Sequence, residues 1–170
     1  MRGATMLAGV LGAVVLWSAT PPSLQELSLP ITGLTAAELR AMFNEVHNGH
    51  AHEAIDIMAP RGTPIHAVVP GQIKKLFLSK AGGVTIYEFD EAGEYSYYYA
   101  HLDRYADGLK EGMRVERGGV IGFVGSTGNA HPQATHLHFA VFELGPVKEW
   151  WKGKAIDPYP ALIAAVKRGK

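Results

Sequence analysis

The sequence predicts a mainly β domain, folded as an antiparallel sandwich or barrel. The chain has 170 residues, enough for one ordinary domain and too few for two full ones. Glycine and proline recur along the chain from residue 60 onward, and short runs rich in β-branched and aromatic residues lie between them. Hydrophobic residues make up 47% of the chain and charged residues 19%, which excludes wholesale disorder. Many short strands at regular spacing are typical of an all-β domain.

The first expected element is an apolar leader within residues 1–20. Residues 4–19 carry no charge, and Thr20-Pro21-Pro22 stops any helix. The run is shorter than the roughly 20 residues of a full membrane span, and therefore fits a signal peptide. Trp17 makes a poor cleavage site, so an uncleaved membrane anchor is the alternative, and an ordinary buried helix is the third. Either of the first two places the rest of the chain outside the cytoplasm.

A connector and a short helix are expected over residues 21–47. The helix would run over residues 34–46, because Thr35 and Glu38 form a capping box in front of an apolar face. That face would consist of Leu39, Met42 and Phe43.

A β domain is expected over residues 48–160. Its predicted strands are Ile65–Val69, Gln72–Leu78, Val84–Phe89, Tyr95–Ala100, Val120–Val124 and His138–Phe142. A hairpin turn is expected at Asp90-Glu91-Ala92-Gly93. The stretch from Trp150 to Pro160 is expected to be a loop, and the tail over residues 161–170 to hold a helical turn or two.

Charge and composition exclude several classes of function. Lys plus Arg and Asp plus Glu each number 16, so the chain lacks the positive field of a nucleic-acid-binding protein. It has no cysteine, which excludes disulfides, thiolate metal sites and thiol nucleophiles. Any transition-metal site must therefore use histidine and carboxylate ligands.

Three short segments hold the histidines that can do chemistry. His52 and Asp56 are four residues apart and share a face in a strand or in a helix. If the segment from His136 is a strand, as Phe139, Val141 and Phe142 suggest, His136 and His138 face the same side about 7 Å apart. His101 ends an aromatic strand. Two histidines, one carboxylate and an open position are typical of catalytic zinc, and further histidines can transfer protons. Spacing alone leaves a chance arrangement open.

Together these segments resemble the lysostaphin-type (LytM-domain) zinc endopeptidases. The matching motifs are His52-Glu53-Ala54-Ile55-Asp56, Tyr99-Ala100-His101-Leu102 and His136-Leu137-His138-Phe139. The connecting stretches Ala59–Ile65, Pro70–Ile73 and Val120–Asn129 are similar too. The resemblance covers roughly residues 45 to 160.

The resemblance implies a fold, a site and a substrate. The fold is a compact antiparallel β domain of the duplicated hybrid motif type, with a narrow groove. One zinc ion per chain is held by His52, Asp56 and His138, and the catalytic residues are His101 and His136. The substrate is the peptide part of peptidoglycan. We therefore expect an exported, monomeric enzyme of the periplasm or cell envelope, attached to the inner membrane if the leader is retained.

Some features depart from the family pattern and keep alternatives open. Ala54 stands where the family commonly has glycine, the segment from Gly82 to Asp90 differs from the common form, and Lys148–Lys154 resembles an inserted groove wall. The alternative function is a non-catalytic envelope regulator or binding module that controls another cell-wall hydrolase. A zinc peptidase acting on ordinary proteins is a further one. The complete set of five site residues favours the enzyme.

Other residues are expected to be structural. His47 and His50 fall in a predicted solvated loop, His66 in a strand, and His131 in an exposed loop. The tyrosines at 97 and 99 alternate with Tyr98, so only one of the two sets can line a cleft.

Overall fold

The computed structural model describes residues 24, 26–47 and 49–169. The expected leader lies outside these residues. Within the described part of the chain, no helix is both long enough and apolar enough to cross a membrane.

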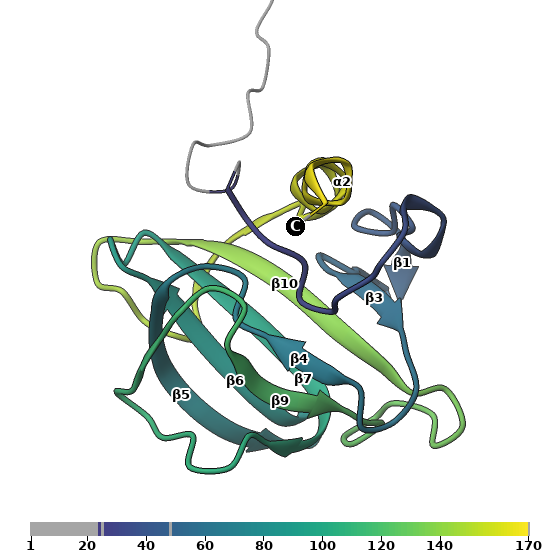
Figure 1. Cartoon of the computed structure of the whole chain (residues 1–170), viewed down its shortest axis with the longest axis horizontal. Helices are drawn as coiled ribbons and strands as arrows, with labels where there is room; N and C mark the ends of the chain where they lie inside the picture. Colours follow the sequence, from purple (N-terminus) through teal and green to yellow (C-terminus); the bar gives the residue numbers. More distant parts are fainter. Residues whose placement is uncertain (1–23, 25, 48, 170) are drawn as a thin grey trace, which may run out of the picture.

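The predicted β fold is confirmed: antiparallel sheet is the main regular structure of the described chain (Figure 1). The elements, in order, are the 3-10 turn η1 (Ala36–Glu38) and the strands β1 (Val46–His47), β2 (His50–Ala51), β3 (Ile55–Met58), β4 (Pro64–His66), β5 (Gly71–Ser79), β6 (Gly83–Asp90), β7 (Tyr95–Tyr105), β8 (Arg114–Val115), β9 (Val120–Val124), β10 (His136–Leu144) and β11 (Gly153–Ile156), followed by the helix α2 (Tyr159–Arg168).

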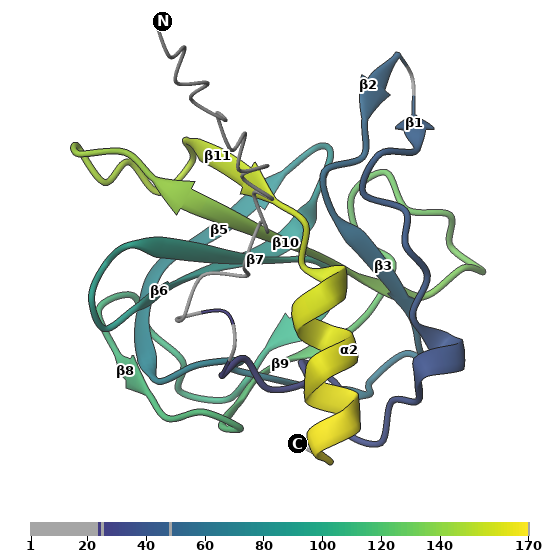
Figure 2. The ribbon, with the colours of Figure 1, turned by 90° about the horizontal axis from the view of Figure 1, so that it is seen from above.

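The long strands β7 and β10 connect the sheet. Its main path runs β11-β10-β7-β6-β5-β8, while β3 pairs with β10 and β9 pairs with both β4 and β7. β1 and β2 form a separate hairpin that leads into β3 (Figure 2). The pairing of β10 with β3 and β7 brings three segments far apart in the sequence side by side.

The expected turn between β6 and β7 is present. The Gly93 amide donates a hydrogen bond to the Asp90 carbonyl at 3.0 Å. The Asp90 carboxylate accepts hydrogen bonds from the amides of Glu94 and Tyr95 at 2.8 and 2.9 Å. A short acidic side chain thus closes the hairpin, as Asp often does in turns.

The prediction of a helix over residues 34–46 is wrong beyond the first turn. The capping box of Thr35 and Glu38 forms, but Leu39 already has an extended backbone with φ −97° and ψ 124°. Leu39 and Met42 reach the core from this extended chain. The carbonyls of Phe43 and Glu45 accept hydrogen bonds from the amides of Glu53 and His52, so the end of this segment pairs with the chain before β3.

The C-terminal region is more regular than expected. β11 pairs with β10 where a loop was predicted, with Ile156 opposite Val141. α2 begins at Tyr159 and is longer than the predicted turn or two. It ends at Gly169, whose left-handed backbone lets its amide bond to the carbonyls of Ala165 and Val166.

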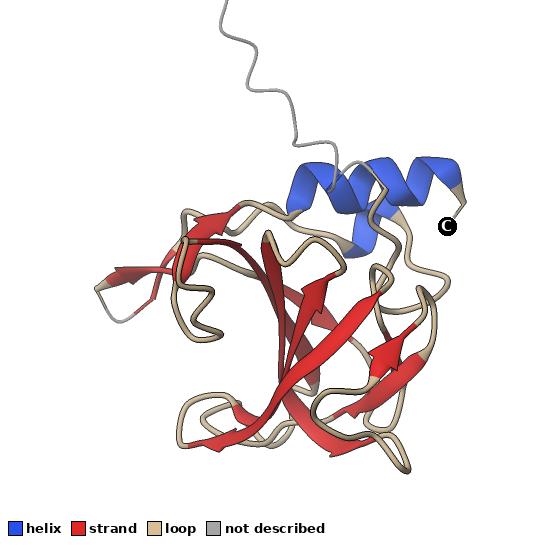
Figure 3. Ribbon diagram, turned by 90° about the vertical axis from the view of Figure 1, so that its left-hand side faces the viewer, coloured by secondary structure: helices blue, strands red, loops and turns tan. Residues whose placement is uncertain are grey.

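The hydrophobic core lies between the sheet and a cover formed by α2 and the N-terminal segment, which lie on the same side of the sheet (Figure 1, Figure 3). The sheet contributes Tyr97, Tyr99 and Phe139, each fully buried. The cover contributes buried residues that include Leu24, Leu27, Leu162 and Ala165. Core side chains therefore come from residues on both sides of the expected 48–160 domain, whose boundaries stay a prediction.

Candidate active site and metal centre

Two strands and the loop before one of them hold the candidate metal ligands. His52 precedes β3, Asp56 lies on β3, and His138 lies opposite Asp56 on β10. The buried neighbours Ile55, Ile57, Leu137 and Phe139 point to the core. Because side chains alternate along a strand, this packing turns Asp56 and His138 to the other face.

The three donor atoms form a compact triangle. His138 Nδ1 lies 2.9 Å from Asp56 Oδ1 and 3.2 Å from His52 Nε2, and His52 Nε2 lies 3.3 Å from Asp56 Oδ1. Neighbouring ligands of a tetrahedral zinc ion with bonds near 2.0–2.1 Å are separated by about 3.3 Å. The two imidazoles and one carboxylate therefore fit a metal ion of this kind in both chemistry and spacing.

The electrostatics of Asp56 favour its charged form. Burial acts to raise its pKa, but the hydrogen bond with His138 and the nearby rings of His138, His52 and His136 outweigh this and lower the pKa of the carboxyl below its ordinary value. An ionised carboxylate among imidazoles is what a divalent cation requires of such a site.

His136 and His101 lie beside this triangle without joining it. His136 Nε2 is 3.9 Å from Asp56 Oδ1. The His101 ring centroid is 4.8 Å from that of His136 and 5.6 Å from that of His138. The structure thus brings together all five residues singled out in the sequence.

Main-chain carbonyls fix the orientation of these two rings. The Nδ1 atom of His101 lies 2.8 Å from the Thr127 carbonyl, and that of His136 lies 2.8 Å from the Ala134 carbonyl. Since a carbonyl only accepts hydrogen bonds, both Nδ1 atoms carry the hydrogen and both Nε2 atoms stay available to a substrate. Burial lowers the pKa of His101, and His136 and His138 lower it further despite the Thr127 bond. A neutral His101 can accept a proton near neutral pH.

Two of the three non-glycine residues with positive φ in the described chain lie at this site. Glu53 and His101 have positive φ angles of 54° and 61°, a conformation that non-glycine residues seldom adopt. Such outliers persist where the surrounding structure holds them, often at functional sites. Ala54, which replaces the common glycine, is not among the positive-φ residues and lies fully buried, so its methyl group fits without backbone strain.

Thr127 is a site residue that the sequence did not reveal. Besides its carbonyl bond to His101, its hydroxyl donates to the Leu102 carbonyl at 2.7 Å and accepts from the Val84 amide at 2.9 Å. It thereby links the residue after His101 to the start of β6. Its only sequence signal is its place in the Ser126-Thr127-Gly128 turn, which gives no hint of a carbonyl aimed at a histidine.

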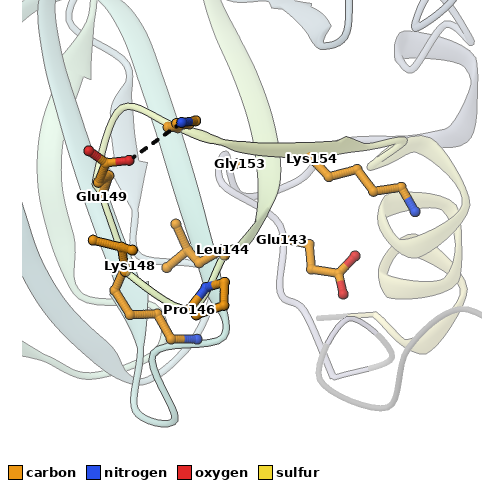
Figure 4. A pocket seen from close by; sticks show the side chains of 10 residues that line it. Glu143, Leu144, Pro146, Lys148, Glu149, Gly153 and Lys154 are labelled. Carbon is orange, nitrogen blue, oxygen red and sulfur yellow. Dashed lines mark ion pairs between the residues drawn. The ribbon is translucent and has the colours of Figure 1, made fainter.

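A small cleft of about 160 Å³ adjoins the metal centre. It is lined by His101, His138, Tyr98, Asn129 and the chain at 81, 82 and 100. Tyr98 is thus the tyrosine that lines a cleft, whereas Tyr97 and Tyr99 are buried. A larger cavity of about 670 Å³ lies in the β10–β11 hairpin (Figure 4), but none of the five site residues lines it.

Among the described side chains, His50, His66 and His131 do not belong to the donor group. His66 Nδ1 bonds the Gly118 carbonyl at 2.8 Å. His50 is exposed, and His131 is exposed and accepts a hydrogen bond from the Gln133 amide at 3.3 Å. Of His47 only the backbone is described, in β1.

Comparison with known proteins identifies relatives over this same region. The pattern of peptidase family M23 matches residues 50–158. The L-Ala--D-Glu endopeptidase of Bacillus subtilis is 36% identical over 118 residues, which are 66% of this chain and 35% of that protein. The peptidoglycan DD-endopeptidase ShyC of Vibrio cholerae is 36% identical over 89 residues, which are 52% of this chain and 19% of that protein. The chain thus spans about a third or less of each relative.

A solved structure shows the same fold. The catalytic domain of the antimicrobial peptidase lysostaphin from Staphylococcus simulans aligns with a TM-score of 0.57 and 33% sequence identity. The alignment covers 66% of this chain and 80% of that domain. The resemblance found in the sequence motifs is therefore confirmed by the family match and by the fold.

Proposed function

The chain belongs to peptidase family M23, and from that membership we propose that it is an exported zinc metalloendopeptidase that cuts peptide bonds in bacterial peptidoglycan. The observation that carries the proposal is the convergence of two imidazoles and a carboxylate at tetrahedral spacing, with two further histidines beside them. The relatives named as endopeptidases, one of them a peptidoglycan endopeptidase, support the substrate class.

In this proposal His52, Asp56 and His138 hold the metal. A zinc ion bound there would act as a Lewis acid, which polarises a peptide carbonyl and lowers the pKa of a bound water molecule. Zinc is favoured because its structural and catalytic sites use histidine and carboxylate ligands at this spacing. The chain contributes no thiolate that would favour a softer metal.

The proposed proton transfers belong to His136 and His101. Both rings present Nε2 to the space beside the metal centre, because their Nδ1 atoms bond to carbonyls. One can take a proton from the attacking water, and the other can donate to the leaving amine or to the developing oxyanion. The proposal lets either ring take the role of the base, because both lie beside the metal centre.

The non-catalytic alternative is not favoured. A protein that only binds a partner needs neither the donor triangle nor the two fixed imidazoles, yet the structure combines all five. The peptidoglycan endopeptidase among the relatives supports a location in the cell envelope or outside the cell. The proposed export rests on the apolar leader of the sequence.

Incubation of the zinc-loaded protein with purified muropeptides tests the proposal. Mass analysis should show products that differ from the substrate by hydrolysis of one peptide bond. The matched control is His136→Ala at equal zinc occupancy, which should leave the substrate largely intact. Zinc-loaded wild-type protein that cuts no cross-linked, stem or bridge peptide would contradict the proposal and favour the binding-module alternative.

A further inference from the structure

A continuous run of aromatic rings leads from the metal centre across the sheet. It starts at Tyr98, whose ring centroid lies 6.0 Å from that of the candidate ligand His138. Tyr98 packs on Tyr87 of the next strand at 4.6 Å, and Tyr87 packs on Trp150 at 4.8 Å. Trp150 in turn contacts Phe77 at 5.4 Å and Trp151 at 5.1 Å. We name these five residues the aromatic run.

The segment between β10 and β11 completes this run. Tyr98, Tyr87 and Phe77 lie on the adjacent strands β7, β6 and β5, and Tyr98 is directly opposite Tyr87. Trp150 and Trp151 belong to the Lys148–Lys154 segment that the sequence suggested as a groove wall. Trp150 reaches the same sheet face through its contacts with Tyr87 and Phe77, and Trp151 packs on Trp150. The run is therefore assembled from distant parts of the chain.

The far end of the run is open to solvent. Trp151 is 60% exposed and Phe77 40% exposed, whereas Tyr98, Tyr87 and Trp150 are partly buried. Exposed rings that are joined to a contiguous apolar surface mark binding surfaces. At its other end the run is continuous with the 160 Å³ cleft, because Tyr98 belongs to the run and also lines the cleft.

The chemistry of the run selects an uncharged ligand with apolar faces. None of its members carries a charge at neutral pH, so it offers no attraction to an anionic polymer. An aromatic ring has a negative face that attracts polarised C–H groups, and one face of a pyranose ring presents such C–H groups. In peptidoglycan the peptide is joined covalently to a chain of pyranose rings, so a surface continuous with a peptide-cutting cleft meets those sugars.

We propose that the aromatic run is a binding platform for the glycan strand of peptidoglycan, adjacent to the cleft in which the peptide is cut. This inference rests on the proposed function. Trp151 and Phe77 supply the exposed rings on which sugars stack, and Trp150 supports both by packing between them. The platform makes the enzyme prefer peptides that still carry their sugars.

An NMR titration of the full chain with the N-acetylglucosamine tetrasaccharide tests binding without any cleavage. The indole N–H signals of Trp150 and Trp151 should shift in a saturable manner. Trp151→Ala and Phe77→Ala should each weaken the saccharide about fivefold, the scale of one aromatic contact. Met113→Ala is the matched control, because Met113 is 47% exposed but lies outside the run. Indole signals that do not move, or equal weakening by the control, would overturn the platform.

Kinetics on two substrates provide the second test. One is a cross-linked muropeptide with its disaccharides, and the other is the same peptide without sugars. Trp151→Ala should lower the ratio of kcat/KM for the first to that for the second by about fivefold. An unchanged ratio would overturn the proposal. If the wild type cuts neither substrate, the proposed function fails, and the saccharide titration still decides whether the platform exists.

Discussion

The four histidines of the site divide into two groups by the partners of their ring nitrogens. His52 and His138 direct a nitrogen at the Asp56 carboxylate. His101 and His136 instead bond their Nδ1 atoms to main-chain carbonyls. The first arrangement suits metal binding, and the second keeps an oriented Nε2 for proton transfer. Removing a member of each group should therefore have different effects.

We predict that His138→Ala loses the metal, whereas His101→Ala and His136→Ala retain it. The latter two should lose activity by about a hundredfold or more, the usual scale for general acid–base groups. Metal analysis and turnover at matched metal occupancy measure the two effects separately. Equal zinc in wild type and His138→Ala would remove His138 from the ligand set. Wild-type rates in the other two variants would refute their assignment to proton transfer.

Glu88 is a second residue whose ionisation is set by the fold. Its side chain is fully buried on β6, where it accepts a 2.5 Å hydrogen bond from the Tyr99 hydroxyl. Burial raises the pKa of Glu88 to about 8, although the Tyr99 bond opposes this. The carboxyl is therefore mostly protonated in the folded protein at neutral pH and ionised in the unfolded chain.

This pKa predicts a loss of stability at alkaline pH. The pKa of Glu88 is higher in the folded protein than its ordinary value of 4.5. The stabilisation that Glu88 gives to the folded state is therefore fully present below pH 4.5 and is lost as the pH rises through the folded-state pKa. Denaturant unfolding should show that the free energy of unfolding falls by a few kcal/mol between about pH 5 and about pH 9. In Glu88→Gln this fall should be smaller. An identical pH dependence in the two proteins would contradict the assignment.

At the level of elements, two turns interlock to hold His101. In the turn at 81–83, the Gly82 carbonyl accepts a hydrogen bond from the His101 amide at 2.7 Å. The turn at 127–129 packs directly against it, because a methyl group on Gly83 would lie 2.2 Å from the Thr127 hydroxyl. The same contact excludes a side chain at Gly128. The glycines thus set the distance between two turns that both bind His101.

We predict that Gly83→Ala destabilises the protein and lowers its activity. Gly83 has a φ of 66°, and the added methyl group would meet Thr127. Gly93→Ala is the matched control, because Gly93 has a φ of 64° but open space around it. The control should cost about 1 kcal/mol, and Gly83→Ala about 3 kcal/mol. Equal costs with equal activities would show that the two turns do not hold each other.

The sequence predicts those elements whose signals are local. Turn residues and alternating β-branched residues locate β5, β6 and β9 to within a residue or so of their ends. The spacing of His136 and His138 correctly places both on one strand. The metal-ligand set, in contrast, came from family resemblance, because spacing alone left other combinations open.

What the sequence misses depends on distant partners. The capping box at Thr35 is a real signal for a helix start, but the following chain bonds to residues 52 and 53 instead. β11 has the sequence Gly-Lys-Ala-Ile, which has no strand pattern and becomes a strand by pairing with β10. Thr127 acts through its carbonyl, which every residue possesses. No residue pattern indicates contacts of these kinds.

At the scale of the whole molecule, the site is built on strands that share one hydrophobic core. β3, β7 and β10 are held by a shared core in which the largest side chains are fully buried, among them Tyr97, Tyr99 and Phe139. Asp56 and His138 lie on the opposite face of β3 and β10, and His52 lies in the chain just before β3. Preassembly of this kind separates folding from metal binding, unlike in small zinc domains that unfold without metal.

We predict that the metal-free protein stays folded. Chelator treatment should keep the β-sheet circular dichroism signal and a cooperative thermal transition, and lower Tm only by the contribution of ligand binding. His138→Ala is the control, and its Tm should not respond to zinc or to the chelator. Loss of the β signal on chelation would show that the metal is part of the fold.

The hairpin before β3 has a consequence for transplanting this site into other proteins. The amides of His52 and Glu53 donate to the carbonyls of Glu45 and Phe43 at 2.8 and 2.9 Å, and those carbonyls lie before the family-matched residues 50–158. A graft limited to the region of family similarity would carry every ligand and both histidines of the proposed mechanism. It would leave behind the scaffold that presents His52, so the transferable unit of this chemistry is longer than its recognisable motif.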